Sequence, residues 1–269
     1  MRLGSIADNR TTMQMSRVPE AALPPLLAPR DALFLDFDGT LAEIAERPEL
    51  VRVAPELVAL IERTQRLLGG ALAIVSGRPL RQIDEHLLPL QLPGAGQHGA
   101  ELRVHGNATP QRRAWPGVAA MAADVVSRFG NDPQLLVEAK GAAVALHYRA
   151  APERAELCQT SMRELAARHG LDVLVGKMVV EARPRGLHKG LAVDALLARP
   201  LFAGRRPVFV GDDTTDEDGF RRAAACGGYG IKVGPGASGA CYRLDGVAAV
   251  HAWLARSADA ASRARESAA

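Results

Sequence analysis

The sequence predicts an α/β protein with a parallel sheet and a second, smaller α+β domain inserted into it. Short apolar runs alternate with helix-length amphipathic segments in both outer parts of the chain, the order of a parallel sheet with covering helices. Between residues 107 and 184 the order changes to helix–strand–strand, twice over, which favours an antiparallel sheet with helices on one face. We therefore expect a discontinuous Rossmann-like core over 30–106 and 185–256, with an αββαββ domain over 107–184.

The composition is that of an ordinary soluble globular protein. Hydrophobic residues make up 48% of the 269 residues, enough for one large core or two modest ones. A net charge of +3 and an aromatic content of 4% give no basis for binding nucleic acid or a membrane surface. Cys158, Cys226 and Cys241 have no C-x-x-C spacing, so neither a disulfide framework nor a zinc site is predicted. No apolar run reaches the ~20 residues that cross a bilayer, and we expect a cytoplasmic protein of open oligomeric state, with a monomer favoured.

The first part of the core follows from its apolar runs and the residues that end them. Residues 1–29 are polar with prolines near their end, and predict a loosely ordered extension. Pro55 suits the first turn of a helix, and Gly69-Gly70 suits its end. The expected elements are a strand ending at Leu35, a helix over 55–68, a strand over 71–75 and a helix over 80–88.

The insert and the second part of the core are predicted in the same way. In the insert we expect helices over 116–129 and 152–168 and strands over 134–139, 142–149, 171–175 and 178–182. After Pro184 we expect helices over 187–197, 220–225 and 246–255 and strands over 207–210 and 229–233. Residues 257–269 are mainly Ala, Ser and Arg, and we expect a tail that frays or stays disordered.

The first strand ends in an acidic pair, Asp36-Phe37-Asp38-Gly39-Thr40. Side chains two apart on a strand share a face, so Asp36 and Asp38 point together and repel unless a cation or a shared proton relieves them. Gly39 and Thr40 allow a sharp turn whose N–H groups suit an oxyanion such as phosphate. An acidic turn that only ends a strand is the alternative, since D-G is a common turn.

Polar residues also follow the other strands. Ser76 could only cap a helix, Lys189 could be a solvated lysine, and the acidic residues at 212–218 could only favour a helix N-terminus. Together they are harder to dismiss, because three predicted parallel strands end in D-x-D-G-T, S-G-R and G-D-D-x-x-D, with H-K-G before the third. The carboxyl ends of parallel strands meet at one edge, where open α/β sheets place ligands.

This set of residues suits phosphoryl transfer to a carboxylate nucleophile. Mg²⁺ prefers carboxylate oxygens, so Asp36 and acidic residues at 212–216 are candidate ligands. Ser76 and Lys189 would hold phosphate oxygens, while Asp38 would act as general acid and then as general base. The candidate catalytic residues are Asp36, Asp38, Ser76 and Lys189. The candidate metal ligands are Asp36, Asp38, Asp212, Asp213 and Asp216.

Four motifs resemble those of the haloacid dehalogenase superfamily, and they occur in the same order. They are Phe34-Leu35-Asp36-Phe37-Asp38-Gly39-Thr40-Leu41, Val75-Ser76-Gly77-Arg78, His188-Lys189-Gly190 and Gly211-Asp212-Asp213-Thr214-Thr215-Asp216-Glu217. The resemblance spans roughly 31–255 and puts the insert between the second and third motifs. Superfamily members with an α+β cap of the C2 type carry it there, so the resemblance implies such a cap.

Within the superfamily the sequence is most similar to trehalose-6-phosphate phosphatases. The similarity includes Gly96-Gln97-His98-Gly99-Ala100-Glu101, Glu138-x-Lys140-Gly141 and Glu181-Ala182-Arg183-Pro184. It implies Mg²⁺, an aspartyl-phosphate intermediate and a cap that closes over a disaccharide. The implied substrate-binding residues are Gly77, Arg78, Gln97, His98, Gly99, Glu101, Glu138, Lys140 and Glu181.

Several alternatives stay open at this point. His98 could be a satisfied histidine in a glycine-rich turn, and Glu138 and Lys140 could form a cross-strand surface pair. A sister phosphatase acting on sucrose phosphate or a glycosyl-phosphoglycerate would share the chemistry. A non-catalytic sugar-phosphate sensor would have lost a catalytic residue, whereas the catalytic set named above is complete.

Overall fold

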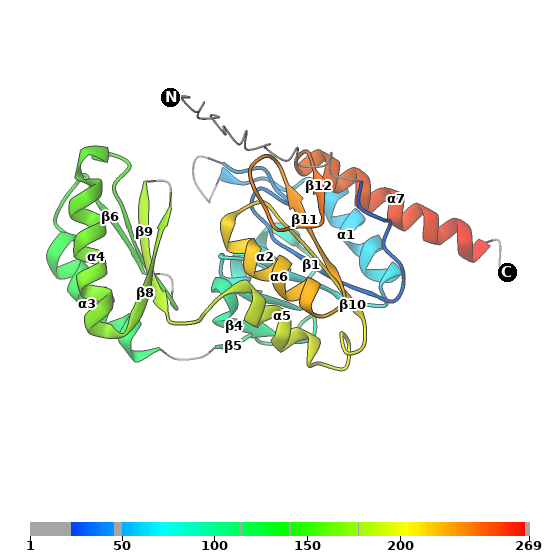
Figure 1. The fold of residues 1–269 in the computed structure, drawn as a ribbon, viewed down its shortest axis with the longest axis horizontal. Coiled ribbons are helices and arrows are strands. Elements are labelled where there is room, and N and C mark those ends of the chain that lie inside the picture. Colours follow the sequence, from blue (N-terminus) through cyan, green and yellow to red (C-terminus); the bar gives the residue numbers. More distant parts are fainter. Residues whose placement is uncertain (1–22, 46–49, 113–114, 140, 177, 267–269) are drawn as a thin grey trace, which may run out of the picture.

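The structure, a computed structural model, contains two sheets, each with its own helices (Figure 1). It describes residues 23–45, 50–112, 115–139, 141–176 and 178–266. The larger sheet has 8 strands in the order β12-β11-β10-β1-β2-β3-β4-β5, and the smaller has 4 in the order β6-β7-β9-β8. The predicted fold class is confirmed: a parallel-sheet core is interrupted by a separate antiparallel α+β unit, called the insert below.

The elements of the core come from both ends of the chain. Its strands are β1 (Asp31–Leu35), β2 (Leu72–Val75), β3 (Gly94–Gly96), β4 (Glu101–Arg103), β5 (Gln111–Arg112), β10 (Arg206–Gly211), β11 (Tyr229–Val233) and β12 (Tyr242–Leu244). Its α-helices are α1 (Pro55–Leu67), α2 (Leu80–Leu87), α5 (Lys189–Leu197), α6 (Glu217–Ala225) and α7 (Val247–Glu266). The first six strands of the sheet order run parallel, while β4 and β5 are antiparallel additions at one edge.

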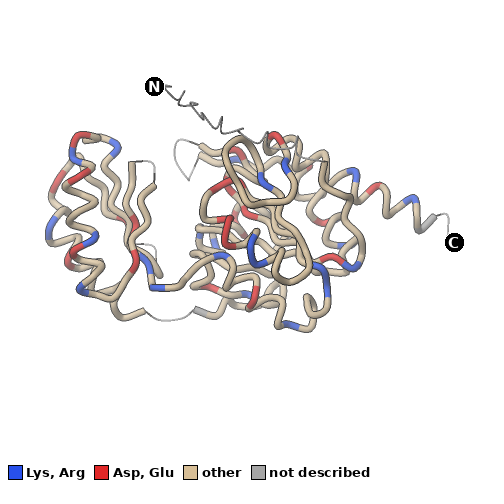
Figure 2. The backbone as a smooth tube through the Cα atoms, in the orientation of Figure 1, with Lys and Arg blue, Asp and Glu red and all other residues tan. Residues whose placement is uncertain are grey.

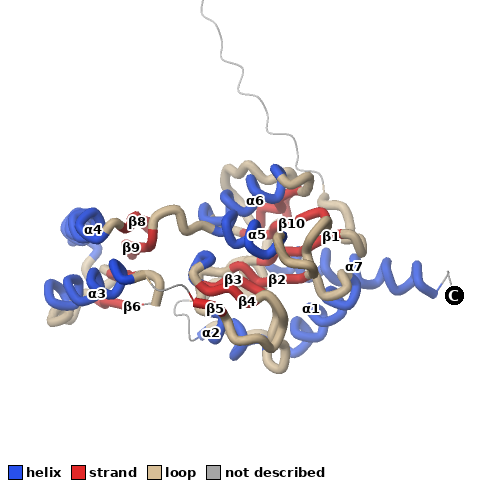
Figure 3. Tube along the Cα trace, turned by 90° about the horizontal axis from the view of Figure 1, so that it is seen from below, coloured by secondary structure: helices blue, strands red, loops and turns tan. Residues whose placement is uncertain are grey.

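Strand β1 lies at the centre of the core sheet. It pairs in parallel with β10 on one side and β2 on the other, and all five of its residues are buried. Helices on both faces cover it, with α5 and α6 on one side and α1 and α7 on the other (Figure 3). Continuous apolar runs such as Leu72–Val75 fit this position, because a strand covered on both faces needs apolar side chains on both.

The insert has the predicted αββαββ order. Its elements are α3 (Pro116–Phe129), β6 (Leu136–Ala139), β7 (Val144–His147), α4 (Ala155–His169), β8 (Leu171–Gly176) and β9 (Val179–Pro184). Helices α3 and α4 pack on one face of the sheet and enclose a separate apolar cluster. The other face of the sheet is turned toward the core (Figures 1 and 3).

Both predicted tails are wrong where the structure describes them. Helix α7 continues to Glu266, so residues 257–266 do not fray: alanine favours helix, and Ser257 and Ala258 are buried. Residues 23–29 lie against the same helix, where Trp253 Nε1 donates to the carbonyl of Pro25 over 3.0 Å. The rest of the expected N-terminal extension, 1–22, lies outside the described residues.

The expected start of the insert at residue 107 is also wrong. Strand β5 pairs with β4, with Glu101 opposite Arg112, so the core sheet continues past this point. The short strands β3, β4, β5 and β12 were not predicted, because segments of two or three residues carry little periodicity.

Basic and acidic residues are interspersed over both the core and the insert (Figure 2). None of the helices described is both long enough and apolar enough to cross a membrane.

Candidate active site

The predicted site residues of the core gather at the carboxyl edge of the sheet. Asp36 follows β1, Ser76 follows β2 and Asp212 follows β10, and these three strands are neighbours. Because parallel strands end at the same edge, three segments far apart in sequence bring their side chains to one place.

Lys189 lies between two aspartates at this edge. It is the first residue of α5, is 2% exposed, and its Nζ lies 2.8 Å from Asp36 Oδ1 and 2.6 Å from Asp216 Oδ1. Burial alone would lower the pKa of Lys189, but the charges of the two aspartates outweigh it and raise the pKa. Lys189 is therefore a fixed ammonium that joins the strand-end aspartate to the acidic loop.

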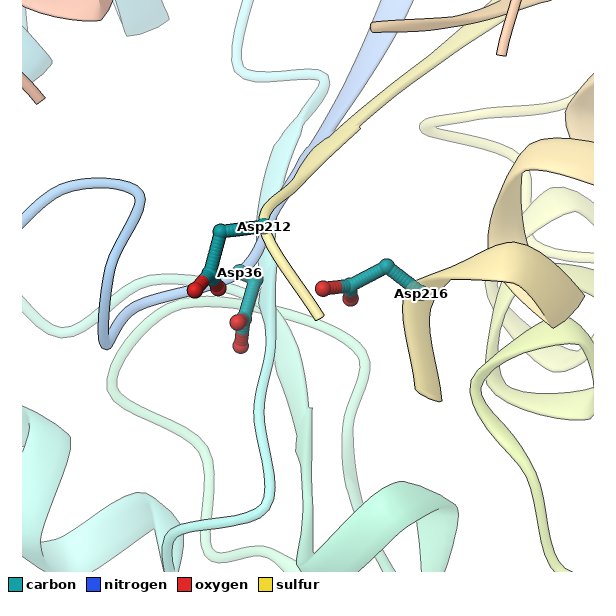
Figure 4. A group of neighbouring side chains, drawn as sticks. All are labelled: Asp36, Asp212 and Asp216. Carbon is teal, nitrogen blue, oxygen red and sulfur yellow. The ribbon is translucent and has the colours of Figure 1, made fainter. Parts of the chain in front are cut away.

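Asp36, Asp212 and Asp216 form one acidic cluster. Their carboxylates point toward one another (Figure 4), and one oxygen of each lies within 4.8 Å of the others. Burial raises the pKa of Asp36 well above its usual value, although Lys189 opposes the shift. Burial, followed by the charges of Asp216 and Asp213, raises the pKa of Asp212 to about 6. The raised pKa values mean that ionising Asp36 and Asp212 is less favourable in this cluster than in water.

Two glycines make room for this cluster. Gly39 has φ +72°, and a Cβ there would lie 2.2 Å from Asp212 Oδ2. A Cβ at Gly211 would lie 2.2 Å from Asp216 Cγ. Any larger residue at either position would push an aspartate out of the cluster.

The other acidic candidates are used differently. Asp213 accepts the N–H of Thr214 over 2.7 Å, and its own N–H donates to Asp216 Oδ2 over 2.9 Å, so it caps the turn that carries Asp216. Its carboxylate and that of Asp38 lie outside the acidic cluster. Of the five predicted metal ligands, the structure brings together the carboxylates of Asp36, Asp212 and Asp216, and it places those of Asp38 and Asp213 apart from them.

The donor set of the cluster fits Mg²⁺. Three carboxylates converge, and among the described residues Lys189 is the one ammonium that contacts them. Hard cations take such oxygen ligands, and no sulfur or imidazole group is part of the cluster. A divalent ion would relieve the repulsion that raises the pKa of Asp212.

Arg78, in the motif Ser76-Gly77-Arg78, holds the side chain of Asp38. Arg78 Nε donates to Asp38 Oδ2 over 2.6 Å, and its terminal nitrogen donates to Oδ1 over 2.7 Å. Ser76 is 1% exposed, and its hydroxyl accepts the N–H of Arg78 over 3.1 Å. Arg78, predicted as a substrate-binding residue, thus has a carboxylate partner within the protein.

Residues 97–99 follow β3 in an unusual backbone conformation. Gln97 has φ 49°, His98 φ 56° and Gly99 φ 105°. A left-handed residue other than glycine costs of order 1–3 kcal/mol, so two in succession need compensating contacts. Gln97 Oε1 accepts the N–H of Ala142 in the insert over 2.9 Å, and His98 Nε2 lies 3.8 Å from Glu181 Oε1 on β9.

The remaining predicted substrate-binding residues have varied surroundings. Glu101 Oε2 accepts the N–H of Leu80 over 2.8 Å and caps α2, a structural contact. Gly77 leaves room for His98, whose Nε2 would lie 3.0 Å from a Cβ there. Glu138 on β6 lies 3.0 Å from His147 on β7. Lys140 lies outside the described residues.

A cleft of about 1650 Å³ joins these groups. Asp36, Ser76 and Lys189 line it from the core, while Glu138 and Glu181 line it from the exposed face of the insert sheet. The cleft is therefore wide enough for a substrate larger than phosphate. Its core end presents an aspartate, a serine and a lysine, and its insert end presents two glutamates.

Sequence reasoning missed Lys232, a buried lysine beside the acidic loop. The signal was present, because a lysine inside the apolar strand Tyr229–Val233 needs a polar partner. His147, the partner of Glu138, lies in the segment Leu146-His147-Tyr148-Arg149, which also resembles the family but was not among the predicted substrate-binding residues.

This fold and site define the class of protein. A parallel sheet with D-x-D at its central strand, a serine, a lysine and an acidic loop at the neighbouring ends, and an α+β insert, places the chain in the haloacid dehalogenase superfamily. The sequence model of the trehalose-phosphatase family matches residues 34–244. The chain therefore belongs to that family of phosphoric monoester hydrolases.

Individual relatives agree with this. The chain is 44% identical over 206 residues to a probable trehalose-phosphate phosphatase of Sinorhizobium fredii, covering 76% of this chain and 78% of that protein. It is 38% identical over 244 residues to trehalose-6-phosphate phosphatase of Escherichia coli, covering 90% and 92%. A solved trehalose-6-phosphate phosphatase related protein matches with a TM-score of 0.71 and 27% identity over 86% of this chain and 98% of that chain.

Proposed function

We propose that this protein hydrolyses trehalose 6-phosphate to trehalose and phosphate, with Mg²⁺ and an aspartyl-phosphate on Asp36. The observation that carries the proposal is the buried Asp36 carboxylate, held by Lys189 over 2.8 Å and facing a cleft that extends to the insert. Family membership supports the choice of substrate.

In the first step a carboxylate oxygen of Asp36 attacks phosphorus, and the bond from phosphorus to the sugar oxygen breaks. Lys189 and Ser76 stabilise the negative charge that spreads over the phosphoryl oxygens. Asp38, in its protonated form, gives its proton to the departing sugar oxygen. The products are trehalose and phosphorylated Asp36.

In the second step water replaces the sugar. Asp38, now a carboxylate, takes a proton from water as the water oxygen attacks phosphorus. The bond between phosphorus and Asp36 breaks, so phosphate leaves and the Asp36 carboxylate is restored.

Asp36, Asp212 and Asp216 would hold Mg²⁺ at this end of the cleft. When bound, the ion offsets the charge of the phosphate dianion so that an anionic carboxylate can approach it. The residues themselves fix the site: Lys189 contacts Asp36 and Asp216, while the N–H of Asp213 fixes the other oxygen of Asp216.

The insert would act as a cap that selects the sugar. Its exposed sheet face presents Glu138 and Glu181 to the cleft, and carboxylates are suitable acceptors for sugar hydroxyls. Closure of this face over a disaccharide would exclude bulk water from the reacting phosphate. The enzyme would work on a small soluble substrate, in the cytoplasm and as a monomer.

A panel of sugar phosphates tests the substrate. Phosphate release should be fastest from trehalose 6-phosphate and much slower from glucose 6-phosphate, sucrose 6-phosphate and a glycosyl-phosphoglycerate. A higher kcat/KM on one of the last two would instead identify a sister phosphatase with the same chemistry. Binding of trehalose 6-phosphate with no phosphate release from any substrate would identify a sugar-phosphate sensor.

A further inference from the structure

Lys232 is a charged side chain inside the core sheet. It lies on β11, whose five residues are all buried, and it is 6% exposed. Lysine is rarely buried to this extent without a partner, because removing an ammonium from water is costly. Neither of the proposed reaction steps uses it.

The ammonium of Lys232 is bound to main-chain oxygens. Its Nζ donates to the carbonyl of Asp212 over 2.6 Å and to the carbonyl of Val233 over 2.5 Å. Among the residues that the structure describes, no carboxylate lies within ion-pair distance of it. The ammonium of Lys232 therefore binds main-chain carbonyls and forms no ion pair with a described carboxylate.

The carbonyl of Asp212 belongs to the loop that carries the acidic cluster. Lys232 pairs in register with Gly211, the last residue of β10, so its side chain reaches the point where this loop leaves the sheet. On the other side of the loop, Asp216 is fixed by Lys189 and by the N–H of Asp213. Asp212 is half-buried, and Lys232 holds its main chain through the hydrogen bond to the Asp212 carbonyl.

We propose that Lys232 is a positioning residue for the divalent cation: it holds the main chain of Asp212 so that the carboxylate turns toward Asp36 and Asp216. This rests on the proposed metal-dependent function. It assigns to a buried lysine, away from the cleft, the task of keeping a self-repelling loop in its metal-binding form. The charge of Lys232 also lowers the pKa of Asp212, against the larger raising effects of burial and the other aspartates.

Position and charge predict opposite effects of removing the ammonium. If Lys232 acted only as a nearby positive charge, its removal would leave a more negative site that binds Mg²⁺ more tightly. If it positions Asp212, its removal frees the loop and Mg²⁺ binds more weakly. The sign of the change in affinity therefore separates the two roles.

The experiment is a Mg²⁺ titration of Lys232→Met, followed by calorimetry or by the rise in Tm, with no substrate present. We expect the dissociation constant for Mg²⁺ to rise about tenfold, the effect of losing one hydrogen bond from a charged donor. Ile231→Val, a loss of one methylene from the same buried strand, is the matched control for lowered stability and should leave Mg²⁺ binding unchanged. Lys232→Gln should weaken Mg²⁺ binding in the same direction if Met at this position prevents folding.

Activity gives a second, independent reading. At saturating Mg²⁺ the KM of Lys232→Met for trehalose 6-phosphate should match that of the wild type, because Lys232 does not line the cleft. Unchanged or tighter Mg²⁺ binding in both Lys232 variants, with a lowered Tm, would overturn the proposal and leave a purely structural lysine. Failure of the wild-type protein to bind Mg²⁺ would overturn the metal assignment itself.

Discussion

Arg78 donates hydrogen bonds to both carboxylate oxygens of Asp38, over 2.6 Å and 2.7 Å. The guanidinium also lies 5.6 Å from the centre of the Phe37 ring and 3.5 Å from His86 Nε2. Burial and the charge of Arg78 lower the pKa of His86. This bidentate contact occupies both carboxylate oxygens of Asp38, whereas a general acid needs one of them to carry a proton toward the leaving group. We therefore expect substrate to draw Arg78 away from Asp38 before the leaving group departs.

Replacing Arg78 by Met should lower kcat/KM for trehalose 6-phosphate by roughly 10-fold or more, since the bidentate contact that places Asp38 is lost. The loss should be smaller with an aryl phosphate, whose leaving group needs little protonation. Steady-state kinetics on both substrates measures the difference. Arg66→Met, an exposed arginine paired with Glu62, is the control. Equal losses on the two substrates would argue against a link between Arg78 and leaving-group protonation.

Asp38→Asn should slow trehalose 6-phosphate turnover by roughly 100-fold or more, the usual contribution of general acid–base catalysis. With an aryl phosphate the first step proceeds unaided while the second lacks its base, so phosphorylated Asp36 should accumulate. Acid quench and mass spectrometry of the peptide that contains Asp36 detects it. If this variant turns over trehalose 6-phosphate at the wild-type rate, Asp38 has no role in proton transfer.

Chelation of divalent cations should abolish activity, and Mg²⁺ should restore it. The apparent Mg²⁺ affinity should depend on pH because Asp212, with a pKa raised to about 6 in the metal-free protein, must be ionised to bind a cation. Below about pH 6 a proton competes with the metal and affinity falls; above it affinity levels off. Mg²⁺ titrations followed by the rise in Tm at several pH values measure this. Full activity after exhaustive chelation would show that the reaction does not depend on a divalent cation.

Much of this site could be predicted because its residues follow apolar strands. Asp36, Ser76 and Asp212 each come directly after a buried run, and parallel strands leave one geometry for their meeting. Side-chain direction could not be predicted in the same way. Asp38 and Asp213 lie in the same sequence motifs as Asp36 and Asp212, yet Arg78 and the N–H of Thr214 hold their carboxylates elsewhere. Only the folded loop decides which aspartates converge.

Glu181→Ala should lower kcat/KM for trehalose 6-phosphate roughly 10-fold or more, since a buried polar contact left unpaired costs ~1–3 kcal/mol. Hydrolysis of a small aryl phosphate should change little, because that substrate reaches only the core end of the cleft. Kinetics with both substrates separates the two effects. Asp172→Ala, an exposed residue on the neighbouring strand β8, controls for a change in the insert sheet. Parallel losses on both substrates would mean that Glu181 acts on the fold or the chemistry.

The least predictable contacts join segments distant in sequence. Gln97 accepts the N–H of Ala142, 45 residues away, and lies in a segment, 97–99, with left-handed backbone conformations. No periodicity signals such a contact. The prediction of a disordered tail at the end of α7 was wrong for a different reason. A composition of Ala, Ser and Arg is typical of both disordered tails and helices, and packing against α1 stabilises the helix.

Turnover of trehalose 6-phosphate by Asp36→Asn tests the central claim most directly. An amide cannot act as the carboxylate nucleophile or carry the phosphoryl group, so we expect no phosphate release above the no-enzyme background. Circular dichroism and Tm matched to the wild type would show that the fold is kept. Substantial phosphate release by a correctly folded Asp36→Asn protein would contradict the aspartyl-phosphate mechanism.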